Sequence, residues 1–358
     1  MIYKCFWGKI FVKSLYEDRG NMRAKPTLST VAKHAGVSIP TVSQVMRRTG
    51  RISEETREKV LKAARDLNYV PNSRAAAMRS GENREVGFVI NQLGNPFNAE
   101  VIGGVVELLE AEGYLVSIVD TRDDPNRQSR QLEAFIRHGR GGLLWVPAQD
   151  TPEETFDLLS AQRIPVVTFL RHVRCDLDHV GIRDAEATTN ATQYLVDLGH
   201  RRIAFLGGTD AAIVRYERKF GYASAMSRNG LSPTVIWDCE DNKLAGLAAM
   251  TALLARHPDI TAVVCNGDMV ALGACLALVR AGLRPGIDVS VFGFDDIQDA
   301  AVATPALTTM AVSPHRLGRK LARALLDRIE DPEMPPVVTE VSAEPVIRAT
   351  TGKPAKIG

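Results

Sequence analysis

The segment Leu28–Asn68 constrains the fold of this chain most, because its apolar residues recur at helical spacing in three short stretches. After the first stretch, Gly36 permits a left-handed turn of the backbone that other residues adopt only with strain. Ser38 is a suitable N-cap for a second helix, in which Val42 and Val45 would be buried. The segment therefore predicts three short helices with a tight turn between the first two.

The second predicted helix leaves its other side free of the apolar core. That side carries Ile39, Pro40, Thr41, Ser43 and Gln44, and the proline is tolerated because it lies in the first helical turn. A unit of this kind either packs against another protein or enters a groove of DNA. Helical periodicity alone leaves both interpretations open.

The distribution of charge favours the second interpretation. Residues 1–80 contain 16 Lys and Arg against 6 Asp and Glu, whereas residues 81–358 contain 28 against 36. The formal net charge of +2 therefore hides a basic head of +10 and an acidic remainder of −8. Because duplex DNA carries dense phosphate charge, a basic module gains an affinity for it that a neutral partner does not supply. The basic segment is expected to face nucleic acid.

Two stretches of this segment carry a specific resemblance. They read LSTVAKHAGVSIPTVSQV, from residue 28, and RISEETREKVLKAARDLNYVPNSRAAAMRSG, from residue 51. Together they resemble the DNA-binding headpiece of the lactose/galactose-repressor (LacI/GalR) family of bacterial transcriptional regulators. The resemblance implies an all-α helix-turn-helix headpiece over residues 27–71 and sequence-specific binding to double-stranded operator DNA.

By this resemblance the second predicted helix lies in the major groove. Ile39, Pro40 and Gln44 would face base edges, where Gln44 could pair bidentately with an adenine. The backbone phosphates would be held by residues whose hydroxyls or nearby helix ends suit anionic oxygens, namely Leu28, Ser38, Thr41 and Ser43. The phosphate contacts would position the headpiece, and the base contacts would select the operator.

Residues 72–83 contain few large apolar side chains and are expected to form a linker in the absence of DNA. The resemblance implies that Ser73–Arg79 folds into a hinge helix on the operator, with Asn72, Ala75 and Met78 in contact with DNA. Met78 would enter the minor groove and kink the duplex. The alternative is that Met78 is an ordinary linker methionine.

From residue 84 onward, short apolar runs alternate with amphipathic stretches, which is the pattern of βα units on a parallel sheet. The expected strands read EVGFVIN, YLVSIVD, GGLLWVP, PVVTFL, RIAFLGG, TAVVCN and VSVFGF. Helices are expected at Ala99–Leu109, Arg127–Ile136, Glu186–Leu198, Arg218–Asn229, Ala245–Ala255 and Met269–Ala281. Residues 84–350 are more than a single sheet usually carries, so two α/β lobes are expected.

The motifs NPFNAEVIGGV, DLGHRRIAFLGG, NGDMVALGA, FGFDD and TPALTTM extend the resemblance over residues 27–348. It implies a body similar to periplasmic sugar-binding proteins, with two lobes, parallel sheets and a ligand cleft between the lobes. The first lobe would comprise about residues 84–183 and 311–331, and the second about 184–310 and 332–350, followed by a tail at 351–358. Residues 1–26 are expected to be a disordered N-terminal extension, of which residues 1–21 are alternatively the product of an upstream start codon.

Candidate effector-binding residues stand where loops leave the carboxyl ends of the expected strands, because ligands bind at that edge of parallel sheets. They are Asn91, Asp120, Trp145, Arg171, Asn266 and Asp295, with Phe97 nearby in NPFNAE. Aromatic faces beside such polar groups suit a sugar, whose C–H face stacks while its hydroxyls need several hydrogen-bonding partners. Phe97 and Trp145 would otherwise be ordinary core residues.

The resemblance also implies that Arg218, Asn266 and Asp295 bind the effector, because they match effector-binding positions of the family. Without that role, Arg218 would be a surface charge on a helix and the other two residues would cap turns. These alternatives stay open at the level of the sequence.

The identity of the effector is constrained by departures from the family pattern. Asn98, Asp241 and Asn242 stand where family members often carry aromatic residues, so the cleft is expected to be polar. A polyhydroxylated or carboxylate-bearing effector, such as a sugar or sugar derivative, is therefore expected before a purine. Arg122 and Arg171 would favour an acidic ligand if both faced the cleft.

Enzymatic activity is not expected. GRGGLLWVP and GGTDAA lack the spacing of a phosphate-binding or dinucleotide-binding loop, and no Gly-x-Ser-x-Gly elbow occurs. His172, Cys175 and His179 match no common zinc spacing and are expected to lie in a polar connection between strands. No catalytic residue, metal or cofactor is expected.

The five cysteines are odd in number and follow no pattern, which is typical of free thiols in the cytoplasm. No apolar run reaches the ~18 residues needed to span a membrane. Operators of such headpieces are near-palindromic, so a homodimer is expected, and the tail TGKPAKIG has no heptads that would form a tetramer. The sequence predicts a cytoplasmic repressor gated by a small-molecule effector. The alternative is a cytoplasmic solute-binding or sensory protein that acts through a protein partner.

Overall fold

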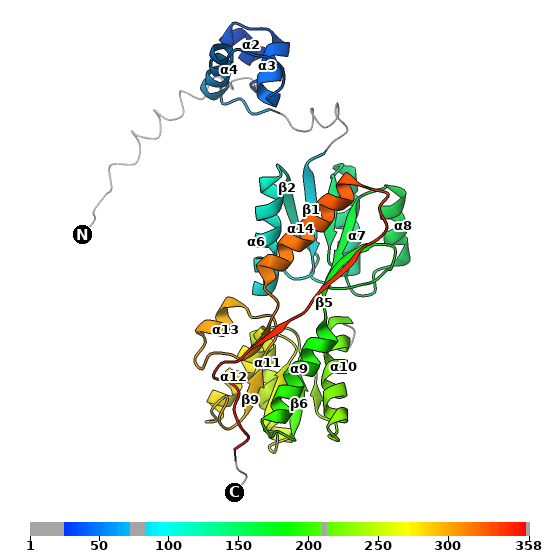
Figure 1. Ribbon diagram of the computed structural model, residues 1–358, viewed down its shortest axis with the longest axis vertical. Helices are drawn as coiled ribbons and strands as arrows, with labels where there is room; N and C mark the ends of the chain where they lie inside the picture. The colour runs from blue at the N-terminus through cyan, green and yellow to red at the C-terminus, as the bar shows by residue number, and fades with distance from the viewer. Residues whose placement is uncertain (1–24, 72–82, 210–212, 356–358) are drawn as a thin grey trace, which may run out of the picture. The chain divides into compact units, whose positions relative to one another are not determined.

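The computed structural model describes residues 25–71, 83–209 and 213–355 (Figure 1). The chain separates into two compact units, an N-terminal headpiece and a body that follows residue 81. The expected hinge contacts Asn72, Ala75 and Met78 lie outside the described residues.

The described part of the headpiece contains the three helices that the sequence predicts. They are α2 (Leu28–Ala35), α3 (Ile39–Arg47) and α4 (Glu54–Asp66). The N-cap of α2 is Thr27, whose hydroxyl accepts a first-turn N–H, and its C-cap is Gly36, with a φ of 68°. One fully buried valine from each helix, Val31, Val42 and Val60, contributes to a small shared core. The predicted turn and the predicted apolar faces are both confirmed.

The first lobe of the body is built on a six-stranded sheet in the order β11-β5-β4-β3-β1-β2, and all neighbouring strands are parallel. The strands are β1 (Glu85–Ile90), β2 (Leu115–Asp120), β3 (Gly142–Trp145), β4 (Val166–Phe169), β5 (Asp178–Ile182) and β11 (Val338–Val341). Helices α6 (Pro96–Ala111) and α14 (Pro314–Glu330) cover one face, and α7 (Pro125–Arg137) and α8 (Glu153–Ala161) cover the other. Because both faces are covered, the central strands are continuous apolar runs.

The second lobe has a four-stranded parallel sheet in the order β7-β6-β8-β9. Its strands are β6 (Ile203–Leu206), β7 (Ile236–Trp237), β8 (Ala262–Cys265) and β9 (Ser290–Phe292). Helices α9 (Asp184–Asp197) and α10 (Ile213–Arg228) pack on one face, α11 (Lys243–Arg256) and α12 (Asp268–Arg280) pack on the other, and the short α13 (Gln298–Val302) follows β9. Two antiparallel strands, β10 (Thr309–Ala311) and β12 (Glu344–Val346), complete the body.

One predicted lobe boundary is wrong. The sequence assigns residues 332–350 to the second lobe, but β11 pairs with β5 at the edge of the first lobe's sheet, with Val338 opposite His179. The Asp178 carboxylate anchors this returning chain, because it accepts the Val337 N–H at 2.7 Å and pairs with Arg328 of α14 at 2.7 and 2.9 Å. A partly exposed edge strand has no continuous apolar run, so the pattern of the sequence did not reveal it.

The polar stretch around His172, Cys175 and His179 lies between and within β4 and β5. The His179 ring is buried, its Nδ1 lies 3.0 Å from the Thr168 hydroxyl, and it stacks on His172 with centroids 4.9 Å apart. Burial and then the neighbouring His172 lower the pKa of His179 to about 4. In the described ranges we find no cluster of His, Cys, Asp and Glu suited to a metal ion, and no helix long and apolar enough to cross a bilayer.

Candidate DNA-reading surface and effector cleft

The start of α3 presents the side chains that the sequence assigns to DNA. Ser38 Oγ accepts the backbone N–H of Thr41 at 3.3 Å and lies 2.8 Å from the Thr41 hydroxyl, which defines the first turn of the helix. Ile39 is 47% exposed, and Pro40 and Gln44 are also exposed. The helix therefore offers side chains for base contacts and an open N-terminus for anionic oxygens.

Gly50 is a residue beside this surface that the sequence analysis missed. It has a φ of 79°, and a Cβ at this position would lie 3.1 Å from Cδ and Oε1 of Gln44. The Gln44 amide thus rests against the loop that follows α3. Leu28 and Ser43, the remaining described candidates for phosphate contact, are half-buried. A glycine just beyond a helix was the only signal in the sequence for this contact.

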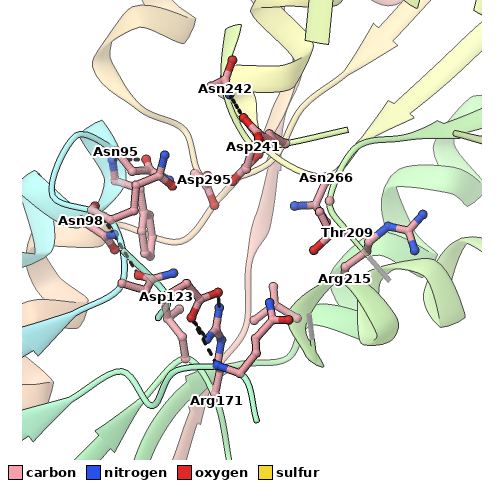
Figure 2. A pocket seen from close by; sticks show the side chains of 18 of the residues that line it. Asn95, Asn98, Asp123, Arg171, Thr209, Arg215, Asp241, Asn242, Asn266 and Asp295 are labelled. Carbon is pink, nitrogen blue, oxygen red and sulfur yellow. Dashed lines mark hydrogen bonds and ion pairs between the residues drawn. The ribbon is translucent and has the colours of Figure 1, made fainter. Parts of the chain in front are cut away.

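A cavity of about 510 Å³ lies in the body and is lined by residues of both lobes (Figure 2). The first lobe contributes the loops after β1, β2, β3 and β4, and the second contributes the start of α10 and the loops after β6, β7, β8 and β9. Seven of the eight effector-binding candidates line it: Asn91, Phe97, Asp120, Arg171, Arg218, Asn266 and Asp295. The strand ends of two parallel sheets thus face one cavity, which we call the cleft.

Trp145 is the exception, and the expectation that it lines the cleft is wrong. Its side chain is fully buried, its ring packs 5.2 Å from that of Phe156 on α8, and its Nε1 donates to Gln128 Oε1 at 2.8 Å. Phe97 lines the cleft but is only 4% exposed and stacks on Phe169 with centroids 6.4 Å apart. Both aromatic rings belong mainly to the core.

The guanidinium of Arg218 organises the second lobe's wall of the cleft. Its Nε donates to Asp184 Oδ1 at 2.6 Å, its Nη1 donates to the backbone carbonyl of Asn266, and its Nη2 lies 3.7 Å from Asp295 Oδ1. Its Cζ sits 3.6 Å from the centroid of the Phe294 ring. Arg218 is therefore a buried structural centre that brings two other predicted site residues together.

Burial dominates the ionisation of these groups. It raises the pKa of Asp184 and of Asp295, and the nearby Arg218 opposes both shifts. Burial also acts against the charge of Arg218, but Asp184 and Asp295 outweigh it and raise the pKa of the guanidinium. Arg218 is consequently held as a cation in this cluster of acids.

The first lobe's wall is organised by a different pair. Arg171 donates from Nη1 to Asp123 Oδ1 at 2.5 Å and from Nη2 to Asp123 Oδ2 at 2.9 Å, and its Nη1 also reaches the Pro147 carbonyl at 2.7 Å (Figure 2). Asn98 on the same wall donates to Asn91 Oδ1 and to the Gln92 carbonyl at 3.3 and 2.7 Å. Arg171 and Asp123 neutralise each other, and the amides together with Asp120 and the exposed Arg122 supply the remaining polarity of this wall.

Four residues of the cleft other than glycine hold left-handed backbone conformations just after strands. Arg122 and Asp123 follow β2 with φ values of 54° and 58°. Leu170 follows β4 with a φ of 62°, and Asp295 follows β9 with a φ of 111°. Such conformations cost about 1–3 kcal/mol each in residues other than glycine, and they persist where the surrounding structure enforces them. At Asp295 the backbone N–H donates to the Met310 carbonyl at 2.9 Å, which holds the carboxylate at the cleft.

Several residues of the cleft were not among the predicted effector contacts. Asp123 and Arg215 line it, and Asp184 supports it from beneath Arg218. Arg215 is fully buried, donates from Nε to the Gly207 carbonyl at 2.9 Å and pairs with Asp238. The position of Asp123 just after the predicted strand YLVSIVD was available as a signal, whereas Asp184 follows β5, a strand that the sequence did not predict.

Known proteins resemble both units of the chain. Residues 27–72 match the model of bacterial regulatory proteins of the lacI family, and residues 192–351 match a periplasmic binding protein-like domain. The maltose regulon regulatory protein MalI of Escherichia coli is 32% identical over 86% of this chain and 94% of its own length. The transcriptional repressor PurR of Vibrio campbellii is 34% identical over 91% and 99%.

The chain belongs to the lacI family. It is a DNA-binding transcriptional regulator with a helix-turn-helix headpiece and a two-lobed effector-binding body. The lac repressor dimer bound to operator and an anti-inducer is similar to it with a TM-score of 0.83 and 25% identity, covering 92% of this chain and all of that one. The CelR–cellobiose complex has a TM-score of 0.69 and 30% identity, covering 91% and 99%.

Proposed function

We propose that this lacI-family member is a transcriptional repressor that binds operator DNA as a homodimer, and that a sugar or sugar derivative in the cleft controls its affinity for the operator. The observation that carries the proposal is the convergence of Arg218, Asn266 and Asp295 on the cleft, in a chain whose basic headpiece exposes the start of α3. Effector binding in the cleft changes the affinity of the headpiece for DNA only if the effector binds two conformations of the body with different affinity.

The headpiece supports a reading role for Gln44, Ile39 and Pro40. These side chains are exposed at the start of α3, and the related lac repressor is known in complex with its operator. Ser38 and Thr41, at the open end of the helix, suit phosphate oxygens. We assign DNA contacts to Asn72, Ala75 and Met78 on the family resemblance alone.

The cleft supports binding of a small polar molecule. Its volume of about 510 Å³ falls in the range of ligand sites, ~300–1,000 Å³. It is lined mainly by amides and charged side chains, and the related CelR is known in complex with cellobiose. We therefore assign effector contacts to Asn91, Phe97, Asp120, Arg171 and the three residues on the second wall.

Self-association is supported by an apolar surface on the second lobe. Leu276 and Val279 of α12 and Val302 of α13 are 51%, 57% and 79% exposed around a depression of about 320 Å³. The related lac repressor is a dimer on its operator. Val279→Glu should place a charge on this surface and shift a dimer toward monomer in analytical ultracentrifugation, whereas an unchanged sedimentation coefficient would exclude this surface from the interface.

A repressor of this kind acts in the cytoplasm, where it can bind chromosomal DNA. No catalytic role is assigned to the cleft. The related proteins MalI and PurR are regulators of transcription.

Binding to the chain's own promoter region tests the DNA part of the proposal. The logarithm of the affinity should fall linearly with the logarithm of salt concentration, with a slope of several units, because each neutralised phosphate contributes about 0.9 to the slope. Gln44→Ala should cost about 1–3 kcal/mol at one base position and leave other positions unaffected. Equal loss on every sequence would remove Gln44 from the reading role, and a flat salt dependence would favour the alternative of a sensory protein with a protein partner.

Effector control is tested separately with Asn266→Ala. This variant should bind the promoter fragment as the wild type does but lose its response to the effector, because Asn266 lines the cleft and is far in the sequence from the headpiece. A thermal-shift screen of sugars identifies the effector, since a ligand at 100 times its dissociation constant stabilises by about 2.7 kcal/mol. An unchanged response in the variant would remove Asn266 from the site.

A further inference from the structure

The second lobe's wall of the cleft contains more carboxylates than cations. Asp184, Asp241 and Asp295 accompany the guanidinium of Arg218. Burial raises the pKa of each of the three carboxyl groups, and Arg218 opposes all three shifts. Nε of Arg218 is committed to Asp184 and Nη1 to the Asn266 carbonyl, while Nη2 remains 3.7 Å from Asp295, beyond hydrogen-bonding distance. Arg218 therefore donates a hydrogen bond to Asp184 alone among the three carboxylates, and Asp241 has a side-chain hydrogen bond with Asn266.

Asp241 and Asp295 lie against the same face of Gly267. A Cβ added to this glycine would be 3.2 Å from Asp241 Oδ1 and 3.3 Å from Asp295 Oδ2, so the two carboxylates flank one point at the start of α12. They come from different loops, after β7 and after β9, and both line the cleft (Figure 2). The fold thus brings two acids together at the cleft.

Two acceptors on this wall lack donors within the described part of the chain. Asp241 Oδ1 and Asn266 Oδ1 are both buried and accept no hydrogen bond there, and the Asn266 side chain as a whole is only 7% exposed. Buried acceptors are almost always paired in folded proteins, and leaving one unpaired costs about 1–3 kcal/mol. A ligand that donates hydrogen bonds to them would recover this cost on binding.

The arginines at the cleft do not compensate for these acids. Arg171 is engaged in its bidentate pair with Asp123, and the buried Arg215 pairs with Asp238. Arg122 lines the rim and is exposed, so solvent screens its charge. Although Arg122 and Arg171 both line the cleft, as the expectation of an acidic ligand required, a carboxylate placed here would meet Asp241 and Asp295 without a free buried cation.

From these contacts we infer that the effector carries a positively charged amine among its hydroxyls, and that Asp241 and Asp295 bind this amine. The inference rests on the proposed function of the cleft and names its ligand class: an amino sugar or a similar amine-bearing polyol. An ammonium group has three donors and no acceptor, which suits the two unpaired acceptors Asp241 Oδ1 and Asn266 Oδ1. The neutral amides of Asn91 and Asn98 on the opposite wall suit the hydroxyls.

Charge supports this assignment independently of hydrogen bonding. Burial raises the pKa of Asp241 and of Asp295, and Arg218 opposes both shifts. One arginine cannot neutralise these two carboxylates together with Asp184. A bound cation favours the ionised carboxylates and relieves their mutual repulsion. A neutral sugar would supply hydrogen bonds to this wall but no charge.

The test is a matched ligand panel on the full-length protein. Calorimetry compares three members of each of the gluco, galacto and manno series: the 2-amino-2-deoxy hexose, the parent hexose and the hexuronate. We expect one amino sugar to bind at least tenfold more tightly than its parent hexose, and the matching hexuronate not to bind. Equal or tighter binding of a parent hexose or hexuronate would overturn the inference, as would a failure of every amine.

Two isosteric variants locate the amine. Asp241→Asn should weaken binding of the preferred amino sugar at least tenfold while changing affinity for the parent hexose less than threefold, because only a charge is removed. Glu240→Gln is the matched control, since Glu240 is an exposed carboxylate on the same rim, and it should have little effect. An equal loss in both variants, or no loss in Asp241→Asn, would remove Asp241 from the amine site.

The same protein separates this inference from the function on which it rests. If a neutral sugar or a uronate binds at least as tightly as every amino sugar and changes affinity for the promoter fragment, the proposed repressor function stands and the amine assignment is wrong. If the protein shows no salt-dependent binding to DNA at all, the function fails whatever the panel gives.

Discussion

The two walls of the cleft handle buried charge in different ways. On the first lobe, Arg171 and Asp123 form a bidentate pair, and the Asp123 side chain keeps 30% of its surface exposed to solvent. On the second lobe, Arg218 lies among carboxylates, and the Asp184 side chain is only 1% exposed. The first wall is electrostatically complete without a ligand, whereas the second contains acceptors and acids that a ligand can still satisfy.

The largest effect on stability is expected when the arginine of each wall is replaced. Arg218→Met should lower the free energy of unfolding of the body by about 3–5 kcal/mol, because Asp184 is left as a buried charge without a partner. Arg171→Met should cost less, about 1–3 kcal/mol, because Asp123 can be hydrated. Urea denaturation of the full-length variants measures both values.

A second substitution controls for simple loss of packing. Adding Asp184→Asn to Arg218→Met should restore part of the lost stability, since the uncompensated charge is then gone. If Arg171→Met proves as damaging as Arg218→Met, or if Asp184→Asn restores nothing, the two walls do not differ as described.

A smaller effect is expected beneath the first wall, at Trp145. Trp145→Phe should lower the free energy of unfolding by about 1–2 kcal/mol, because it removes the hydrogen bond to Gln128 Oε1 and leaves space beside Phe156. Affinity for the preferred ligand should not change, because Trp145 does not line the cleft. Denaturation measures the stability and calorimetry the ligand affinity of the same preparation. A tenfold loss of affinity would show that Trp145 contributes to the ligand site after all.

The case of Trp145 indicates what a sequence can and cannot supply. The edge of the sheet at which a strand ends follows from its apolar run and from parallel topology. Asn266 and Asp295, which were expected at strand ends, both line the cleft. Which face a side chain takes at that edge depends on strand alternation and on the helices that cover it. Trp145 points to the face covered by α7 and α8, and the sequence pattern did not distinguish this from the cleft.

Charge pairs were the other feature that the sequence did not reveal. Arg218 and Asp184 are 34 residues apart, and Arg328 and Asp178 are 150 apart, so neither pair has a local signature. The same holds for β5, where Asp178 is buried because the distant Arg328 and Val337 satisfy it, and for β11, whose strand is partly exposed. Apolar strands, in contrast, were predicted well because burial on both faces leaves its mark within each strand.

The smallest expected effect concerns pH and the second lobe alone. Burial, then the charges of Asp184 and Glu340, raise the pKa of Glu217 to about 7 from its usual 4.5, while Arg218 acts in the opposite direction. A carboxyl with a raised pKa in the folded state binds its proton more tightly there than in the unfolded chain. Its contribution to stability is therefore lost as pH rises from about 4.5 to about 7, and the free energy of unfolding should fall across that window.

Glu217→Gln should remove this part of the pH dependence, because the side chain no longer titrates. Denaturation of wild type and variant at pH 5 and pH 8 gives the comparison: the two proteins should be closest in stability at pH 5, and the variant should be the more stable at pH 8. Glu186→Gln is a matched control, since Glu186 is an exposed carboxylate on the adjacent α9. If both variants change the pH profile equally, Glu217 does not have a specially raised pKa. The two walls of the cleft then do not differ in this respect.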